Sequence, residues 1–285
     1  MALAYNLPGK LRNGFSENNY TYTGDSQLVN DGAGWKLRLL TSGSLTMAAN
    51  VDVDIFIVGA GGGGAPANWG FPGSGGAGGY TKTISGVMLP ANTAYIVTIG
   101  AGGTSGQASN AQNCTFTSGG TGGSTTFGNY TANGGGGGVH FAYDSDPKGG
   151  DGGCGGGGNR VNGNTGSGGS DGSDGQGSIP GTGQGTTTRE FGESAGALYA
   201  GGGGAGYGVQ SSSSQYPQSL GGEGGGGDGN NSTGTGNING EANTGGGGGG
   251  GSSYNSGGVS STYPDGWHFK AGTGGSGIVI IRNAR

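Results

Sequence analysis

Residues 51–64 read VDVDIFIVGAGGGG and contain both building materials of this chain. In the first half, Val51, Val53 and Ile55 alternate with their neighbours in a period of two, and β-forming residues dominate, which predicts a strand. The second half runs into uninterrupted glycine without a turn residue. We expect the rest of the chain to repeat this change from strand to glycine tract. Short apolar strands would anchor the glycine tracts, and loops of aromatic and polar residues would join the tracts.

Glycine makes up 82 of the 285 residues, and only 8 are proline. Average usage is roughly 7 % glycine, and a collagen needs glycine at every third position with abundant proline, which this chain lacks. Disorder of the middle region is an open alternative, because glycine loses much entropy on ordering and buries no side chain. The strand-like segments at both ends of the glycine region favour an ordered structure.

Charged residues make up 9 % of the chain, and the net charge is −5. Because no cluster of Lys and Arg occurs, we expect no nucleic-acid partner. No apolar run approaches the roughly 20 residues of a membrane span, so membrane insertion is not expected. The start of the chain lacks the apolar core of a signal peptide, which predicts synthesis in the cytoplasm.

The strand signals lie mainly at the two ends of the chain. Alternating apolar residues predict a small antiparallel β-layer over residues 20–58, and the fully apolar run 278–281 is typical of a central strand. Residues 80–84 and 95–99 predict a hairpin about a turn at 90–92. Weaker strand signals occur at residues 115–117, 124–127 and 186–200.

The chain divides into three parts by composition. Residues 1–19 are polar and mixed, and we interpret them as an arm or attachment segment. Residues 20–133 are expected to form a β-rich base with the first glycine tracts. Residues 134–285 are expected to form a glycine-rich bundle with a closing strand at 277–282. No stretch offers three helical turns with an apolar stripe, so we expect few helices.

Glycine tracts can be ordered as polyglycine-II helices. Without a Cβ, the chain can adopt the extended three-fold helix, which rises about 3.1 Å per residue and has no internal hydrogen bonds. Neighbouring helices then satisfy each other's N–H and C=O groups, with Cα–H contacts to carbonyls in addition. The runs 155–158, 201–204 and 245–251 suit the interior of such a bundle. We predict a mainly β/irregular, helix-poor fold with a small antiparallel β-base, a bundle of polyglycine-II helices and aromatic-polar end loops.

Two motifs in the glycine region do not point to a nucleotide or a metal. Gly59, Gly61 and Gly64 match the dinucleotide-binding pattern G-x-G-x-x-G, but no helix follows and no acid stands about 20 residues on. Asp171 and Asp174 lie among glycines as in calcium-binding repeats, yet the nonapeptide period is absent. We therefore expect no cofactor and no metal.

Catalysis and a disulfide are not the expected chemistry either. His140 and His268 are the only histidines, and no spacing of Cys, His and acids supports zinc or a catalytic triad. We expect no enzyme and name no catalytic residue. Cys114 and Cys154 lie in glycine-rich surroundings. One bridge between them stays open, and we favour two free thiols.

Aromatic and polar segments interrupt the glycine at residues 65–74, 139–148, 207–219 and 252–270. They hold our receptor-binding candidates, which are Trp69, Phe71, His140, Phe141, Tyr143, Tyr207, Tyr216, Tyr254, Tyr263, Trp267 and His268. Because these side chains cannot enter a glycine-packed interior, we expect them at the ends of the bundle. Aromatics with Ser, Asn and Asp on rigidly held loops are typical of recognition surfaces and suit stacking on sugar rings. Capping the bundle against water is the alternative, and both roles can coexist.

Several segments together resemble the glycine-rich domain of bacteriophage and prophage tail proteins. They are YTYTGDSQLVNDG, LLTSGSLTM, VDVDIFIVGAGGGG, YIVTIGAGG, GQGTTTREFGE, LYAGGGGAG, ANTGGGGGGG and GGSGIVIIR. The chain is similar, more loosely, to the glycine-rich adhesins at the tips of long tail fibres, in which polyglycine-II helices form a sandwich and distal loops contact the host receptor. A weaker likeness is to the glycine-rich region of anaplastic lymphoma kinase-type receptors. The resemblance implies an ordered bundle and a virion role, and it supplies no catalytic residue.

The expected function is that of a phage tail-tip receptor-binding protein. Its partners would be a bacterial surface glycan or protein and, through residues 1–19, a tail or fibre protein; a homotrimer stays open. A structural virion spacer without specific binding is the first alternative. An ice-binding protein is the second, although the bulky loops and the lack of a regular Thr or Ala face argue against it.

Overall fold

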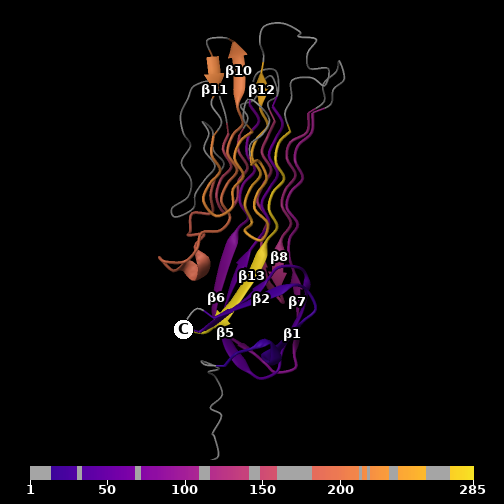
Figure 1. Cartoon of the computed structure of the whole chain (residues 1–285), viewed down its shortest axis with the longest axis vertical. Helices are drawn as coiled ribbons and strands as arrows, with labels where there is room; N and C mark the ends of the chain where they lie inside the picture. The colour runs from indigo at the N-terminus through magenta and orange to yellow at the C-terminus, as the bar shows by residue number, and fades with distance from the viewer. Residues whose placement is uncertain are drawn as a thin grey trace, which may run out of the picture.

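A computed structural model describes residues 14–30, 34–67, 72–108, 116–140, 148–158, 182–211, 214–216, 219–230, 237–254 and 270–285. Figure 1 shows sheets at one end of the molecule, extended glycine tracts running away from them, and a small sheet at the far end. We call the first end the base and the extended tracts the bundle. In the described residues the helices are the short 3₁₀ turns Glu17–Asn19 and Glu190–Gly192, so the expectation of a mainly β, helix-poor fold is confirmed.

The base consists of two five-stranded sheets. The first has the order β1-β4-β7-β8-β9, in which the strands are β1 (Tyr20–Tyr22), β4 (Gly43–Met47), β7 (Ala94–Thr98), β8 (Thr125–Phe127) and β9 (Tyr130–Ala132). The second has the order β2-β3-β13-β5-β6, in which the strands are β2 (Ser26–Asn30), β3 (Trp35–Leu39), β13 (Ile278–Asn283), β5 (Val51–Val58) and β6 (Thr81–Leu89). The last strand, β13, is antiparallel to both β3 and β5. The central strand predicted at residues 278–281 is therefore confirmed.

The hairpin predicted from residues 80–84 and 95–99 is wrong. Strand β6 pairs with β5, whereas β7 pairs with β4 and β8, so the two strands belong to different sheets. The connection crosses between the sheets because it is held to β4: Asn92 N donates to Met47 O at 2.8 Å, and Ala91 N donates to Asn50 Oδ1 at 2.8 Å. Tertiary contacts thus outweigh the local turn signal.

Two of the three weaker strand signals do not become regular strands. Residues 124–127 contain β8, as predicted. Phe116, in the 115–117 segment, makes only an isolated bridge to Ala108, and the 186–200 segment contributes a bridge between Arg189 and Leu198 beside a 3₁₀ turn.

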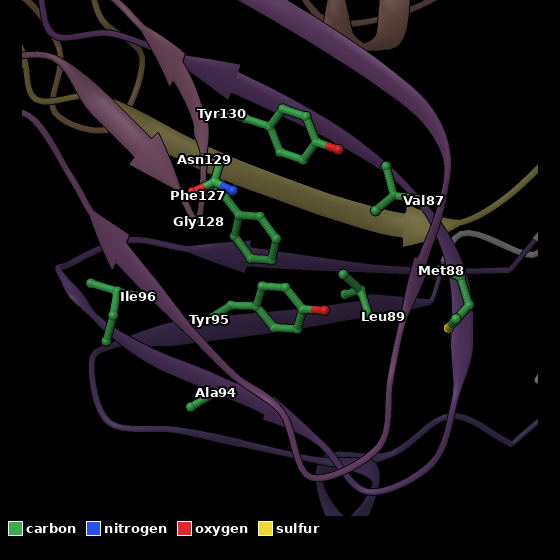
Figure 2. A pocket seen from close by; sticks show the side chains of 10 residues that line it. All are labelled: Val87, Met88, Leu89, Ala94, Tyr95, Ile96, Phe127, Gly128, Asn129 and Tyr130. Atoms are coloured by element: carbon green, nitrogen blue, oxygen red, sulfur yellow. The ribbon is translucent and has the colours of Figure 1, made fainter.

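Edge strands border a pocket on the side of the base. It has a volume of about 720 Å³ and is lined by Val87, Met88, Leu89, Ala94, Tyr95, Ile96, Phe127, Gly128, Asn129 and Tyr130. Figure 2 shows the rings of Tyr95, Phe127 and Tyr130 on the side facing Val87 and Leu89. The pocket lies between the end of β6, the start of β7 and the turn that joins β8 to β9.

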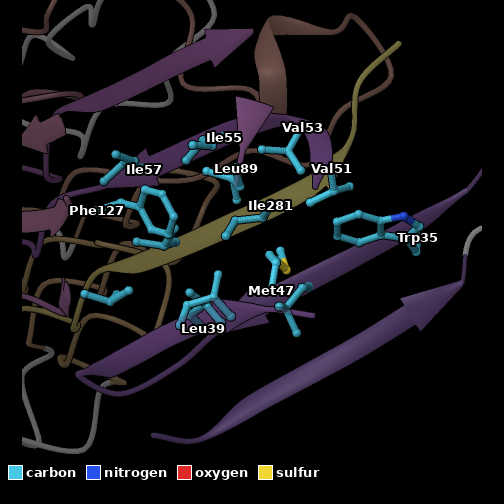
Figure 3. Packing of buried hydrophobic residues seen from close by; sticks show 14 of the residues in the cluster. Trp35, Leu39, Met47, Val51, Val53, Ile55, Ile57, Leu89, Phe127 and Ile281 are labelled. Carbon is cyan, nitrogen blue, oxygen red and sulfur yellow. The ribbon is translucent and has the colours of Figure 1, made fainter. Parts of the chain in front are cut away.

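The main apolar core lies between the two sheets. Val53, Ile55 and Ile57 of β5 and Ile281 of β13 are fully buried there and pack with side chains of the opposite sheet such as Phe127 (Figure 3). The intervening residues of β5 and β13 face the other way and are also buried, against Phe191, Tyr199 and Ala200. Burial on both faces explains why residues 278–281 are apolar without alternation.

Residues 186–200, which we call the clamp segment, cover this outer face and are tied to it by charges. Arg282 donates from Nε to Asp54 Oδ2 at 3.2 Å and from Nη1 to Glu193 Oε1 at 2.6 Å. Its guanidinium carbon lies 4.0 Å from the ring centre of Phe191. Because Asp54 and Arg282 are both almost fully buried, each relies on the other for charge compensation.

The glycine tract 59–67 shows the hydrogen-bond period of a polyglycine-II helix. Its backbone N–H groups donate to three neighbouring tracts in turn. Gly59, Gly62 and Ala65 donate to the tract 72–80, at the carbonyls of Tyr80, Ala77 and Ser74. Ala60 and Gly63 donate to Gly123 and Gly120, and Gly61 and Gly64 donate to Gly275 and Gly272. The N···O distances are 2.8 to 3.0 Å. Every third residue meets the same neighbour, as the three-fold helix requires.

The same tract also accepts hydrogen bonds from three further tracts, so it has three donor and three acceptor neighbours, six in all. The donors to it are Gly103 and Gly106, Gly135 and Gly138, and Gly248 and Gly251. The tracts 72–80 and 245–252 are bonded to the tract 59–67 and to each other, and each likewise meets six tracts. The centre of the bundle is therefore packed hexagonally through backbone alone.

The strands of the base continue directly into neighbouring tracts of the bundle. Strand β5 runs into tract 59–67, tract 72–80 runs into β6, and tract 270–277 runs into β13. Neighbours in the sheet thus remain neighbours in the bundle. The central tracts come from both sides of the boundary that we predict between residues 133 and 134, and a division into domains there stays a prediction.

Candidate recognition surface at the far end of the bundle

The structure describes only part of the candidate set. His140 and Tyr207 are described with their side chains, and both are partly exposed. Tyr216 and Tyr254 are described as members of short strands. The other candidates lie outside the described residues: Trp69, Phe71, Phe141, Tyr143, Tyr263, Trp267 and His268.

The described residues that flank these segments meet in one hydrogen-bonded layer, which we call the end layer. Its bonds are Gly251 N to Ala65 O at 2.9 Å, Gly73 N to Gly251 O at 2.8 Å, Gly206 N to Gly73 O at 2.9 Å, Ser74 Oγ to Val139 O at 2.6 Å, Tyr207 N to Asn230 O at 2.8 Å and Asn230 Nδ2 to Lys270 O at 3.0 Å. The described tract ends that border residues 68–71, 141–147, 231–236 and 255–269 therefore all meet at this layer.

A small sheet stands beyond the end layer. Strand β10 (Gly208–Ser211) is antiparallel to β11 (Ser214–Tyr216) and parallel to β12 (Ser253–Tyr254). Gly208 pairs with both Tyr216 and Ser253, and Val209 pairs with Tyr254, so the backbone brings two candidate tyrosines onto one sheet. The sequence did not predict these strands, because Ser, Gln and Tyr over so few residues give no apolar alternation.

His140 sits in a small polar-aromatic group at the same end. Its Nδ1 lies 3.1 Å from Ser118 Oγ, and its backbone N donates to the same oxygen at 3.4 Å. Its ring stacks near Phe116, with ring centres 6.4 Å apart. Phe116 and Ser118 were not among the predicted candidates. The one available signal was a single Phe among Thr and Ser residues, which we interpreted as a weak strand.

Asp151 holds two described residues, Lys148 and Thr182, close together. Its carboxylate accepts hydrogen bonds from Thr182 N at 2.6 Å and from Lys148 Nζ at 2.9 Å. Partial burial raises the pKa of Asp151, but the hydrogen bonds from Thr182 and Lys148 outweigh it and hold the pKa below its usual value. The carboxylate thus holds together Lys148 and Thr182, the described residues that follow 141–147 and 159–181 in the chain.

The described residues contain no cluster of three or more His, Cys, Asp or Glu side chains that could hold a metal ion. In the same residues no helix is long and apolar enough to cross a membrane. Cys154 is buried, with its sulfur 3.7 Å from Thr188 Oγ1. Cys114 lies outside the described residues, so pairing of the two cysteines stays untested.

Comparison with known proteins gives a family. A family model described as a glycine-rich domain matches residues 40–284. A comparison with curated proteins finds no match. Because the match spans β4 to β13 and every described tract of the bundle, the chain belongs to the family of glycine-rich domains.

Proposed function

We propose that this protein is a receptor-binding protein of a bacteriophage tail tip, which displays aromatic loops on its bundle to a glycan or protein of the bacterial surface. The observation that carries the proposal is the end layer. The described ends of tracts that are far apart in the sequence, and that adjoin most of the aromatic candidates in the chain, meet at one end of the bundle, opposite the base (Figure 1).

The packing of the bundle suits this role physically. A rigid support lowers the entropy lost when loops are ordered on binding, which improves affinity without new contacts. Contacts in the centre of the bundle are made by backbone groups, so loop sequences can vary without altering the interior. Rigid scaffolds with variable loops are a common solution to recognition.

The opposite end supports an attachment role. The base is packed by side chains, and the described residues 14–19 lie there, with Phe15 stacked on Trp35 at 3.8 Å between ring centres. In our proposal this end binds a tail or fibre protein, and assembly takes place in the host cytoplasm. The proposal involves no nucleic acid and no membrane insertion, and it is compatible with a homotrimer.

Loop exchange tests the proposal. Residues 252–270 would be replaced by the equivalent segment of a glycine-rich tail protein with another host, and binding of purified protein to host bacteria would be measured. We expect binding to be lost or redirected. The control is Lys82→Ser, at an exposed position of β6 in the base, which should bind as the unmodified protein does. Unchanged binding by a correctly folded loop variant would overturn the proposal.

A structural spacer remains the second candidate, because a backbone-packed bundle is stiff by itself. The two functions differ in what they require of the aromatic residues. Trp69→Ser, Tyr143→Ser and Trp267→Ser should abolish infection if the loops bind a receptor. A spacer carrying the same changes should still give infectious particles.

A further inference from the structure

The pocket in the base combines three features that mark an uncovered interface. Its lining contains no charged residue (Figure 2). Ile96 and Met88, which line it, are 63 % and 53 % exposed. Large apolar side chains that are exposed side by side typically mark an interaction site. Among the described strands, β6 and β9 are the edges of their sheets on this side.

An edge strand beside an apolar pocket is complementary to one kind of occupant. The unpaired N–H and C=O groups of an edge favour an added strand, and a neighbouring pocket accepts every second side chain of that strand. The occupant should therefore be extended, apolar on one face and uncharged over the part that enters the pocket.

The chain itself contains a segment of this description. Residues 2–7 read ALAYNL, so Leu3, Tyr5 and Leu7 alternate with Ala2, Ala4 and Asn6. This period of two is typical of a strand with one apolar face. Pro8 and Gly9 follow directly and would end the strand. The segment carries no charged side chain.

Residues 8–13, which we call the tether, are long enough to bring this segment to the pocket. The described chain begins at Gly14, and the next residue, Phe15, stacks on Trp35 of β3 with ring centres 3.8 Å apart. Strands β3, β13, β5 and β6 lie side by side, so Trp35 and the pocket residue Val87 are about 15 Å apart, which is three strand spacings. Residues 8–13 alone can span about 20 Å when extended.

We propose that residues 2–7 dock in this pocket of the same chain as an added strand, with Leu3, Tyr5 and Leu7 facing the apolar lining and the backbone against the open edge of β6. The short tether favours the same chain, because it raises the effective concentration of the segment to the millimolar range. The docking does not involve the receptor-binding loops, so its test is separate from the loop-exchange test of the proposed function.

Cross-linking of the full chain tests the docking directly. Tyr5→Cys and Met88→Cys would be combined in a Cys114→Ser background and treated with a short bis-maleimide, and the products would be identified by electrophoresis and mass spectrometry. We expect a cross-link within one chain. The matched control pairs Tyr5→Cys with Leu220→Cys, which is also exposed but lies in the bundle, and it should give none. A cross-link between chains would overturn the same-chain assignment and make a second copy the occupant.

Amide exchange gives an independent measurement. Leu3→Asp with Leu7→Asp should speed exchange of the β6 amides that point away from β5 by about tenfold or more, since each 1.4 kcal/mol of lost docking is a factor of ten. Ala4→Asp with Asn6→Asp adds the same charge on the other face of the segment and should leave exchange unchanged. Equal exchange in both variants, together with no cross-link, would overturn the docking altogether.

Discussion

Side chains hold the base together, whereas backbone groups hold the bundle together. In the base, side chains fill the space between two sheets, as Ile281 and Phe127 do. In the bundle, the space between neighbouring tracts is filled by backbone, and a Cβ built on Gly62 would lie 2.1 Å from the carbonyl oxygen of Gly136. Glycine therefore acts here as a packing residue, because the missing side chain allows the backbones of neighbouring tracts to approach each other closely.

The two regions also depend on each other. A net backbone hydrogen bond contributes only about 1 kcal/mol, and each glycine loses more entropy on ordering than other residues do. Glycine tracts alone therefore do not strongly favour one arrangement over another. The β-strands of the base select the arrangement, since β5, β6 and β13 fix which tracts begin side by side.

The largest effect should come from adding one methyl group at the centre of the bundle. Gly62→Ala puts a Cβ into fixed backbone of the tract 133–140, and we expect a loss of about 5 kcal/mol or more of unfolding free energy, or failure to fold. Denaturant unfolding measures it.

The matched control for that change is Gly123→Ala. Its Cβ would have its nearest neighbour, Ala101 N, at 3.0 Å, so a shift of a few tenths of an ångström relieves the contact. The loss should be clearly smaller. Equal losses for the two variants would contradict backbone packing as the cause.

The buried charge pair of the base should give the next largest effect. Arg282→Met leaves Asp54 buried without its partner and releases Glu193 of the clamp segment. We expect a loss of about 3–5 kcal/mol, as for other broken buried pairs. Adding Asp54→Asn to Arg282→Met should restore part of this loss; a double variant as unstable as the single one would show that Asp54 is not the cause.

Removing side chains should separate the two regions most clearly. Ile281→Ala leaves a cavity between the sheets and should cost about 2–5 kcal/mol. Ala65→Gly, in the tract 59–67, removes a buried methyl group but leaves the backbone bonds in place, and it should cost only about 1 kcal/mol. Thermal and denaturant unfolding compare them. Similar losses would mean that the bundle also relies on side-chain packing.

The smallest effect concerns pH and belongs to the base. Burial and the charge of Asp25 raise the pKa of Tyr22 to about 12, and its hydroxyl donates to Thr41 O. Between the ordinary value near 10 and about 12, the unfolded chain loses this proton while the folded one keeps it, so stability falls as the pH rises through this window. Tyr22→Phe should flatten the fall. An unchanged slope in unfolding measured from pH 9 to 12 would contradict this assignment.

Local pattern predicted the strands with the strongest apolar signals and missed those held only by tertiary contacts. Strands β5 and β13 follow directly from their side chains. The sheet of β10, β11 and β12 does not, because its pairing depends on where the tracts before each strand end. Phe116 was likewise missed beside His140, since the two rings come together only through the packing of the tracts 117–124 and 133–140.

By itself, the sequence determined that apolar runs would form strands, and it favoured extended helices satisfied by their neighbours over disorder for the glycine runs. Only the tertiary structure decided which tract lies beside which, that β6 and β7 belong to different sheets, and that the described tract ends next to the aromatic segments meet in one end layer. The physical reason is that a glycine tract has no side chain with which to select a partner. Its neighbours are fixed by the strands and turns at its two ends.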